Sequence, residues 1–172
     1  MDRLPREFYQ RPAEEVARDL LGRELVSTVD GRLASGVVVE TEAYLGIAYS
    51  ACHAAGGRRT ARTESLYRAG GHAYVYLVYG LHWCLNITTG PPDEPTCVLI
   101  RALEPLAGIE AIRERRPVKD ERRLTDGPGK LCQALARILE QQFFNHLLLA
   151  HGAPVTEEGK ETLRRFLKEQ GS

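Results

Sequence analysis

The sequence lacks an excess of charge of either sign, a long apolar run and a recognisable export signal. Its 172 residues include 23 Lys and Arg and 23 Asp and Glu, so the formal net charge is zero. This balance excludes a strongly basic packaging protein, although it leaves room for a local basic face. No apolar run is long enough for a transmembrane helix, and residues 1–5 lack the charged-then-apolar layout of a secretion signal. We therefore expect a protein of the cytoplasm or the nucleus, with no membrane contact.

Cysteine is scarce and is never paired at short spacing. The four cysteines lie far apart and form no C-x-x-C motif, so the spacing typical of zinc ligands is absent. Cys84 and Cys97 lie inside apolar runs, which predicts small, reduced and buried side chains. A thiol nucleophile formed by Cys52 and the adjacent His53 is disfavoured, because neighbouring side chains point in different directions.

Neither internal repeats nor a linker divide the chain, so we expect one domain over residues 1–172. Strand patterns concentrate in the middle and helical patterns at the ends, which predicts an α+β sheet with flanking helices. The turn signal Asp30-Gly31 predicts a hairpin between the first two strands. The expected strands cover about residues 24–29, 33–44, 72–78, 83–88 and 96–103. The expected helices cover about residues 12–21, 64–68, 107–115, 128–139 and 156–168, and a long loop covers 46–63.

Acidic side chains alternate along the second expected strand. Glu40, Glu42 and Tyr44 share one face of it, because alternate side chains of a strand point the same way. A carboxylate near the end of a buried strand is costly unless it is paired or used in chemistry. Alternation alone favours the simpler interpretation, a solvated face with ordinary surface acids.

The long loop after this strand contains a histidine and three arginines. His53 on its own is more often structural or exposed than catalytic. Arg58, Arg59 and Arg62 lie within five residues of one another, and arginine forks match phosphate oxygens. A solvated charged loop explains these arginines equally well.

The densest signal is the aromatic segment His72–Trp83. Tyr74 and Tyr76 share a strand face, and Tyr79 precedes Gly80 at the end of that strand. The segment predicts either ordinary core packing or a stacking pocket for a flat base, in which electron-rich rings favour a cationic one. Asn86 lies at a strand position where its amide could discriminate hydrogen-bonding groups, or be a surface amide near a turn.

Residues 127–130, Gly-Pro-Gly-Lys, open an expected helix. Free N–H groups at a helix start attract anions, which makes Lys130 and its neighbours a weak candidate for a phosphate contact. The segment is not a P-loop, because the G-x-x-x-x-G-K-[ST] pattern is absent.

Taken together, these segments resemble the alkyladenine (3-methyladenine) DNA glycosylase family. The resemblance covers about residues 5–136, with its motifs in the family's order and spacing. The matching segments are Val39–Gly46, His53 with Gly56–Thr60, Tyr74–Gly80, Asn86, Val98–Pro105 and Gly127–Leu135.

The resemblance implies a role for each candidate residue. Glu42 resembles the general base that activates water, and Arg101 the group that holds this water. Tyr79 resembles the wedge that fills the duplex when a base is flipped out. The implied walls of the base pocket are Tyr44, His53 and Tyr76, with Asn86 as a gate against normal guanine. For a DNA-binding protein, the loop arginines and the helix start are candidate contacts to the DNA backbone, at Arg58, Arg59, Arg62 and Lys130.

The resemblance also implies the fold, the partner and the reaction. The expected fold is a single α/β domain of the α+β type, built on a curved, mostly antiparallel sheet like the C-terminal domain of a formyltransferase. The partner is double-stranded DNA that contains damaged purines, and the protein is expected to be a monomer, associated with the nucleoid in a bacterium. No metal or redox cofactor is implied. No lysine occupies a matching pocket position, so we expect a monofunctional hydrolase that leaves an abasic site.

After Ala136 the motifs stop, and residues 137–172 predict a divergent helical tail. This departure motivates an alternative, a protein of the same fold that binds lesions but is weak or inactive in catalysis. A second alternative is a small-molecule hydrolase with Glu40, Glu42 and His53 around a metal; it is disfavoured because no H-x-x-x-H or similar ligand spacing occurs.

Overall fold

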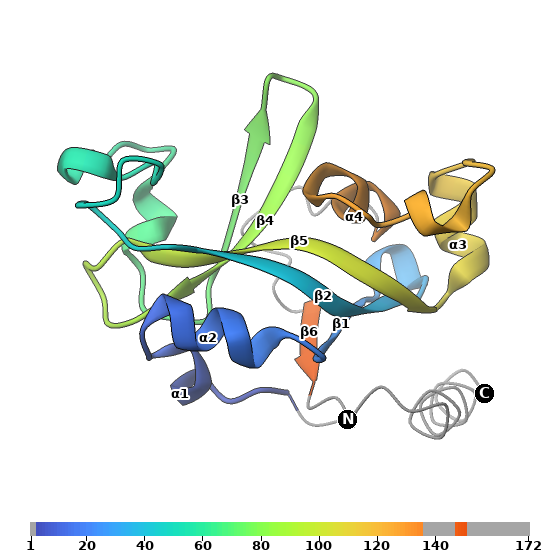
Figure 1. The fold of residues 1–172 in the computed structure, drawn as a ribbon, viewed down its shortest axis with the longest axis horizontal. Coiled ribbons are helices and arrows are strands. Elements are labelled where there is room, and N and C mark those ends of the chain that lie inside the picture. Colours follow the sequence, from blue (N-terminus) through green and yellow to red (C-terminus); the bar gives the residue numbers. More distant parts are fainter. Residues whose placement is uncertain (1–2, 136–146, 151–172) are drawn as a thin grey trace.

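The computed structural model describes residues 3–135 and 147–150, and its centre is one open antiparallel sheet (Figure 1). Six strands form it in the order β3-β4-β5-β2-β1-β6. Every pairing in this sheet is antiparallel. The strands are β1 (Glu24–Ser27), β2 (Ala34–Tyr44), β3 (Ala73–Val78), β4 (His82–Thr89), β5 (Thr96–Ala107) and β6 (Leu147–Ala150). The predicted α+β class and the mostly antiparallel sheet are confirmed.

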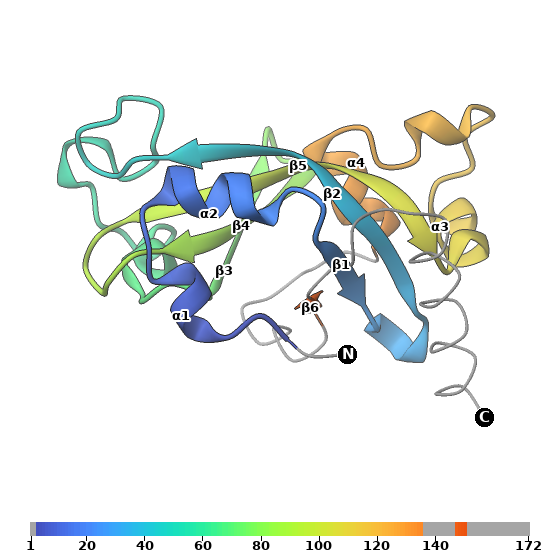
Figure 2. The same cartoon turned by 60° about the horizontal axis from the view of Figure 1, so that its bottom comes forward.

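Short helices pack against both sides of the sheet. Figures 1 and 2 place α2 on one side of β2 and β5 and α4 on the other. Val16 and Leu20 from α2 and Leu131 and Leu135 from the α4 region are fully buried and join one apolar core with the strands. The α-helices are α1 (Arg6–Tyr9), α2 (Ala13–Leu20), α3 (Ile109–Arg115) and α4 (Pro128–Ala134). The 3-10 turns are η1 (Val29–Gly31), η2 (Ala55–Gly57), η3 (Glu64–Tyr67) and η4 (Glu121–Arg123). Within the described ranges, no helix is long and apolar enough to cross a membrane.

Two predicted boundaries are wrong in the region between β1 and β5. Strand β1 ends at Ser27, and residues 29–31 form a 3-10 turn instead of the two-residue hairpin turn expected at Asp30-Gly31. Strand β5 continues to Ala107 instead of ending near Leu103. Its extension is held by β2, whose residues Ser35 and Gly36 pair with Ala107 and Pro105. Tertiary pairing thus overrides the local strand-ending signal of a proline.

Part of the predicted helical tail is also wrong. Leu147–Ala150 form β6, which pairs antiparallel with β1 through registers such as Leu25 with Leu149. The strand satisfies the hydrogen-bonding groups on the open side of β1. The helix expected over 156–168 and the continuation of the 128–139 helix past Leu135 lie outside the described residues.

Gly108 joins β5 to α3 and is required for two reasons. Its φ is +66°, and a Cβ atom there would lie 1.9 Å from the carbonyl oxygen of Leu33. We expect Gly108→Ala to lower the free energy of unfolding by about 2–5 kcal/mol, from left-handed backbone strain and overpacking. Urea denaturation measures this loss.

Gly31→Ala is the matched control, because its φ is +69° and nothing lies within 4 Å of its added Cβ atom. It should cost only the backbone strain, about 1–2 kcal/mol. Equal losses for the two variants would show that the close approach of Leu33 does not constrain this turn.

Candidate active site

The site begins at an irregularity in the pairing of β2 with β5. The register shifts between Val38 and Glu40 and again between Glu40 and Thr41, where the partner moves from Ala102 to Ile100. Arg101 therefore has no directly opposite partner in β2. Bulges of this kind redirect side chains, and this one places Arg101 beside the acidic residues of β2.

Arg101 bridges Glu40 and Glu42. Its Nε donates a hydrogen bond of 2.8 Å to Glu40 Oε1, and its Nη1 donates one of 2.7 Å to Glu42 Oε2. The shared face of Glu40 and Glu42 predicted by alternation is thereby confirmed. The hydrogen bond to Glu40, followed by that to Glu42, raises the pKa of Arg101 above its ordinary value. The Arg101 and Glu42 side chains are each 37% exposed, so both reach solvent while they are paired.

A pocket opens next to this ion pair, with about 260 Å³ of empty space including its open mouth. Its aromatic walls are Tyr44, Tyr74, Tyr76 and His53. The Tyr74 and Tyr76 ring centroids lie 5.2 Å apart with a tilt of 32°. Tyr44 links the pocket to the ion pair, because its phenol forms a hydrogen bond with Glu42. Burial, followed by the charge and the hydrogen bond of Glu42, raises the pKa of Tyr44 above its ordinary value. The remaining lining residues are Ala51, Cys52, Leu66, Asn86 and Cys97.

His53 forms the loop side of the pocket. Its Nδ1 is 2.8 Å from the Tyr74 hydroxyl, and its ring meets that of Tyr76 edge-on at a centroid distance of 4.5 Å. Desolvation, and then the charge of Arg62, lower the pKa of His53 below its ordinary value of 6.5. The imidazole is consequently a neutral wall at neutral pH.

Asn86 lies at the bottom of the pocket rather than at a surface turn. It is only 1% exposed, so the surface interpretation of this amide is wrong. Its Nδ2 donates to the Tyr74 carbonyl oxygen at 3.3 Å, and its Oδ1 accepts from the Cys97 thiol at 3.6 Å. Burial raises the pKa of that thiol, so Cys97 remains protonated and acts as a donor. These two contacts fix the orientation of the amide.

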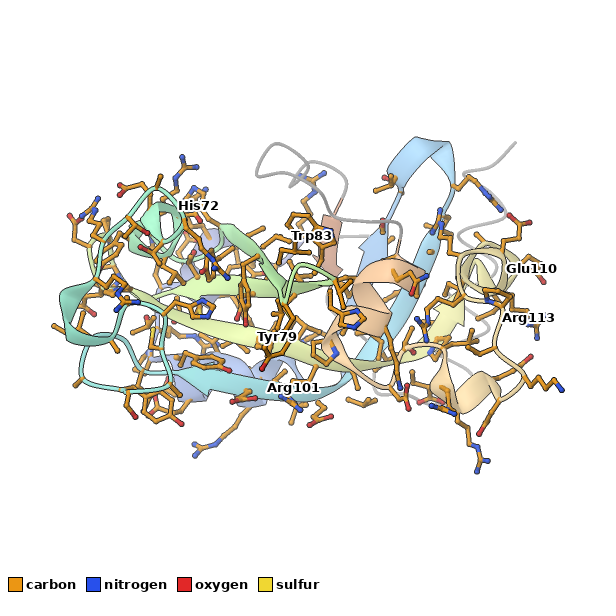
Figure 3. The ribbon with its side chains drawn as sticks, turned by 90° about the horizontal axis from the view of Figure 1, so that it is seen from above. His72, Tyr79, Trp83, Arg101, Glu110 and Arg113 are labelled. Atoms are coloured by element: carbon orange, nitrogen blue, oxygen red, sulfur yellow. The ribbon has the colours of Figure 1, made fainter. Side chains whose placement is uncertain are left out.

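Tyr79 lies at the tip of the β3–β4 hairpin, which Figure 3 shows from above. It is 91% exposed and has a φ of +51°, which is uncommon for a residue other than glycine. Leu81, two residues on, is 75% exposed, and its N–H donates to the Val78 carbonyl oxygen at 3.0 Å. The tip therefore presents two unpacked apolar side chains on a hydrogen-bonded turn.

The three loop arginines differ in their surroundings. Arg59 donates to Glu64 and Asp93 and lies 4.5 Å from the Tyr67 ring centroid, so it is engaged within the protein. Arg62 donates to the Leu77 carbonyl oxygen at 3.1 Å and lies 5.9 Å from the centroid of Tyr76, at the pocket edge.

The other two predicted backbone contacts are a loop arginine and a lysine. Arg58 is exposed to solvent. Lys130, on α4, pairs with Asp126 at 2.7 Å. A phosphate contact by any of these four basic residues stays a prediction.

The structure brings together Glu42, Arg101, Tyr44, His53, Tyr76 and Asn86. Strand alternation placed Tyr74 beside Tyr76 in the candidate stacking pocket, and the structure confirms that both line it. The sequence analysis did not place Cys52, Cys97 and Leu66 in the pocket, or Leu81 at the hairpin tip. The two cysteines carry no local signal, because only the folded sheet and loop bring them to the pocket. In the part of the chain that the structure describes, no three His, Cys, Asp or Glu side chains are grouped to hold a metal ion.

The fold places an aromatic pocket beside a carboxylate that is paired with an arginine. The family model described as Methylpurine-DNA glycosylase (MPG) matches residues 7–166. The chain therefore belongs to the methylpurine-DNA glycosylase family, and it is a DNA glycosylase, a hydrolase of base excision repair. The match to the family model extends beyond Ala136, the end of the motifs that carry the resemblance.

Bacterial relatives are about 50% identical to this chain over 80% of its length. A protein of Bacillus cereus (strain Q1) is 51% identical over 144 residues, which cover 80% of this chain and 70% of the relative. A protein of Bacillus thuringiensis (strain Al Hakam) is 50% identical with the same coverage. Both carry the name "Putative 3-methyladenine DNA glycosylase".

The lowered pKa of His53 gives a test of the pocket geometry. We expect the His53 ring to titrate below 6.5 in an NMR pH titration, with its signal assigned from His53→Gln. Arg62→Gln should move the midpoint upward, because it removes a positive charge that disfavours the imidazolium. Arg58→Gln is the matched control from the same loop and should leave the midpoint unchanged.

The same shift sets a pH dependence of stability. Because the folded-state pKa is the lower one, the unfolded chain binds more protons between the two values. The contribution of His53 to stability is complete above 6.5 and is lost as the pH falls through the folded-state pKa. A His53 midpoint at or above 6.5 would contradict the lowered pKa of the ring.

Proposed function

We propose that this protein excises alkylated and deaminated purines, of the 3-methyladenine, 7-methylguanine and hypoxanthine class, from double-stranded DNA. It flips the damaged nucleotide into the pocket and hydrolyses the N-glycosidic bond without cutting the strand. The observation that carries the proposal is the Arg101–Glu42 pair at the edge of an aromatic pocket. The names of the bacterial relatives support 3-methyladenine as one of the bases.

In the proposed reaction, Glu42 is the general base and Arg101 holds the attacking water. The water oxygen bonds to C1′ of the flipped nucleotide as the bond from C1′ to the purine nitrogen breaks. The water proton passes to Glu42, and the bonding electrons leave with the purine. An alkylated purine is cationic and departs as a neutral base, so it requires less assistance than hypoxanthine. General-base assistance of this kind typically contributes about 10²–10⁴-fold.

The pocket residues supply recognition. The rings of Tyr44, Tyr76 and His53 suit stacking against a flat purine, and electron-rich tyrosine faces favour a cationic one. His53 without a charge avoids repelling such a cation. Asn86, fixed by its contacts to Tyr74 and Cys97, acts as the gate that excludes the amino group of guanine.

Tyr79 acts as the wedge. Extruding a base costs a few kcal/mol of unstacking, and an inserted aromatic ring recovers part of it. Its exposure at the hairpin tip allows such insertion without opening the protein core. Arg58, Arg62 and Lys130 are the basic side chains proposed to contact the flanking phosphates; Arg59 joins them only if DNA displaces Glu64 or Asp93. The enzyme acts as a monomer.

The test is single-turnover release of base from a duplex that contains one hypoxanthine. The wild type should release it, and Glu42→Gln should slow release about 10²–10⁴-fold because the amide cannot accept the water proton. Glu110→Gln, an exposed carboxylate on α3 far from Arg101 in Figure 3, is the control and should retain the wild-type rate. Release that is unaffected in Glu42→Gln would remove Glu42 from the mechanism. Absence of release by the wild type, with lesion-selective binding intact, would identify a lesion-binding protein instead.

The wedge is tested by binding. We expect Tyr79→Ala to weaken affinity for a lesion duplex about 5- to 150-fold, from ~1–3 kcal/mol of lost stacking at 1.4 kcal/mol per tenfold. Tyr79→Phe keeps the ring and should bind like the wild type. Fluorescence anisotropy at fixed salt measures both affinities, since phosphate contacts make binding depend on salt. Equal affinities for the Ala and Phe variants would exclude stacking by this side chain.

A further inference from the structure

Glu40 has a place in the site that the proposed chemistry does not use. It lies within the bulge of β2 and accepts the Nε hydrogen bond of Arg101, while Glu42 accepts from Nη1. Its side chain is 54% exposed, more than that of Glu42, and Tyr44 bonds to Glu42. Two carboxylates thus share one guanidinium, and only one of them lies against the pocket wall.

We propose that Glu40 is a positioning residue for hydrolysis, which holds Arg101 in place while Glu42 takes up the water proton. The inference rests on the proposed function, in which Glu42 is the base. A carboxylate that accepts a proton loses its charge and with it most of its attraction for a guanidinium. Arg101 would then be released at the moment when its water is attacking. The hydrogen bond from Nε to Glu40 is not on the proton's path and persists through this step.

A purely structural role is disfavoured by the exposure of the pair. Ion pairs that reach solvent contribute little to folding stability. The Glu40–Arg101 contact is of this kind, so its removal should leave the fold intact. Variants at Glu40 should accordingly change the reaction without changing thermal or urea unfolding.

The experiment measures the single-turnover rate of hypoxanthine release for Glu40→Gln. We expect the rate to fall about 10- to 100-fold, because Arg101 loses its fixed position beside the water. The affinity for the lesion duplex should stay within about twofold of the wild type. Glu40→Asp, which keeps the charge, should recover part of the rate. Asp126→Asn is the control, because it removes a carboxylate that pairs with Lys130 rather than with Arg101.

Repeating the Glu40→Gln change in the Arg101→Gln variant separates positioning of Arg101 from other roles of Glu40. In Arg101→Gln, the added change Glu40→Gln should have no further effect, because Glu40 acts through Arg101. An unchanged rate in Glu40→Gln, or an equal effect in both backgrounds, would overturn the inference. If Glu42→Gln also left release unchanged, or if the wild type released no base, the proposed function itself would fail, and the two failures are thereby distinguished.

Discussion

The site depends on one guanidinium held between two carboxylates across the β2–β5 pairing. Regular antiparallel pairing would leave Arg101 opposite a single residue of β2, and the register shifts around Glu40 remove that partner. The sheet tolerates this irregularity because β2 and β5 are the longest strands that the structure describes. Paired residues on either side of the register shifts keep the two strands hydrogen-bonded. The ion pair thus lies on regular strands rather than on a loop, and sites on strands are held more precisely than sites on loops.

The pocket is organised around hydrogen bonds between its own walls. Tyr74 is 2% exposed, yet its hydroxyl contacts His53 and its carbonyl oxygen accepts from Asn86. One buried residue therefore connects the loop side of the pocket with its floor. The loop after β2 is in turn held by local turns, such as the Thr60 and Thr63 contacts, and by Arg59 with its acidic partners. The engaged state of Arg59 explains how a loop rich in charge can form a fixed wall.

The sequence predicts much of this arrangement, and the exceptions have physical causes. Alternation places Glu40 and Glu42 on one face, and the family motifs select the residues that gather at the pocket. Alternation does not report register, so the bulge that brings Arg101 to both carboxylates could not be derived. Cys97 reaches Asn86 only through the β4–β5 pairing, which no local pattern encodes.

The strand boundaries show the same limit. Pro105 is a local signal for the end of a strand, yet β5 passes through it because it pairs with Gly36. A Cβ atom on Gly36 would lie 2.9 Å from both the Glu104 carbonyl oxygen and the Leu103 Cβ atom. The close approach of the two strands is therefore a property of the pair, and neither segment shows it alone. The strand at Leu147–Ala150 similarly depends on the free edge that β1 offers.

The left-handed backbone at Tyr79 has a kinetic consequence. A tyrosine in this conformation costs about 1–2 kcal/mol of backbone strain. The hydrogen bond from the Leu81 N–H to the Val78 carbonyl oxygen stabilises the strained turn. The ring is thus displayed to solvent on a hydrogen-bonded turn in the protein alone. In the wedge role that we propose for Tyr79, the ring needs no rearrangement of the hairpin tip before it meets a duplex.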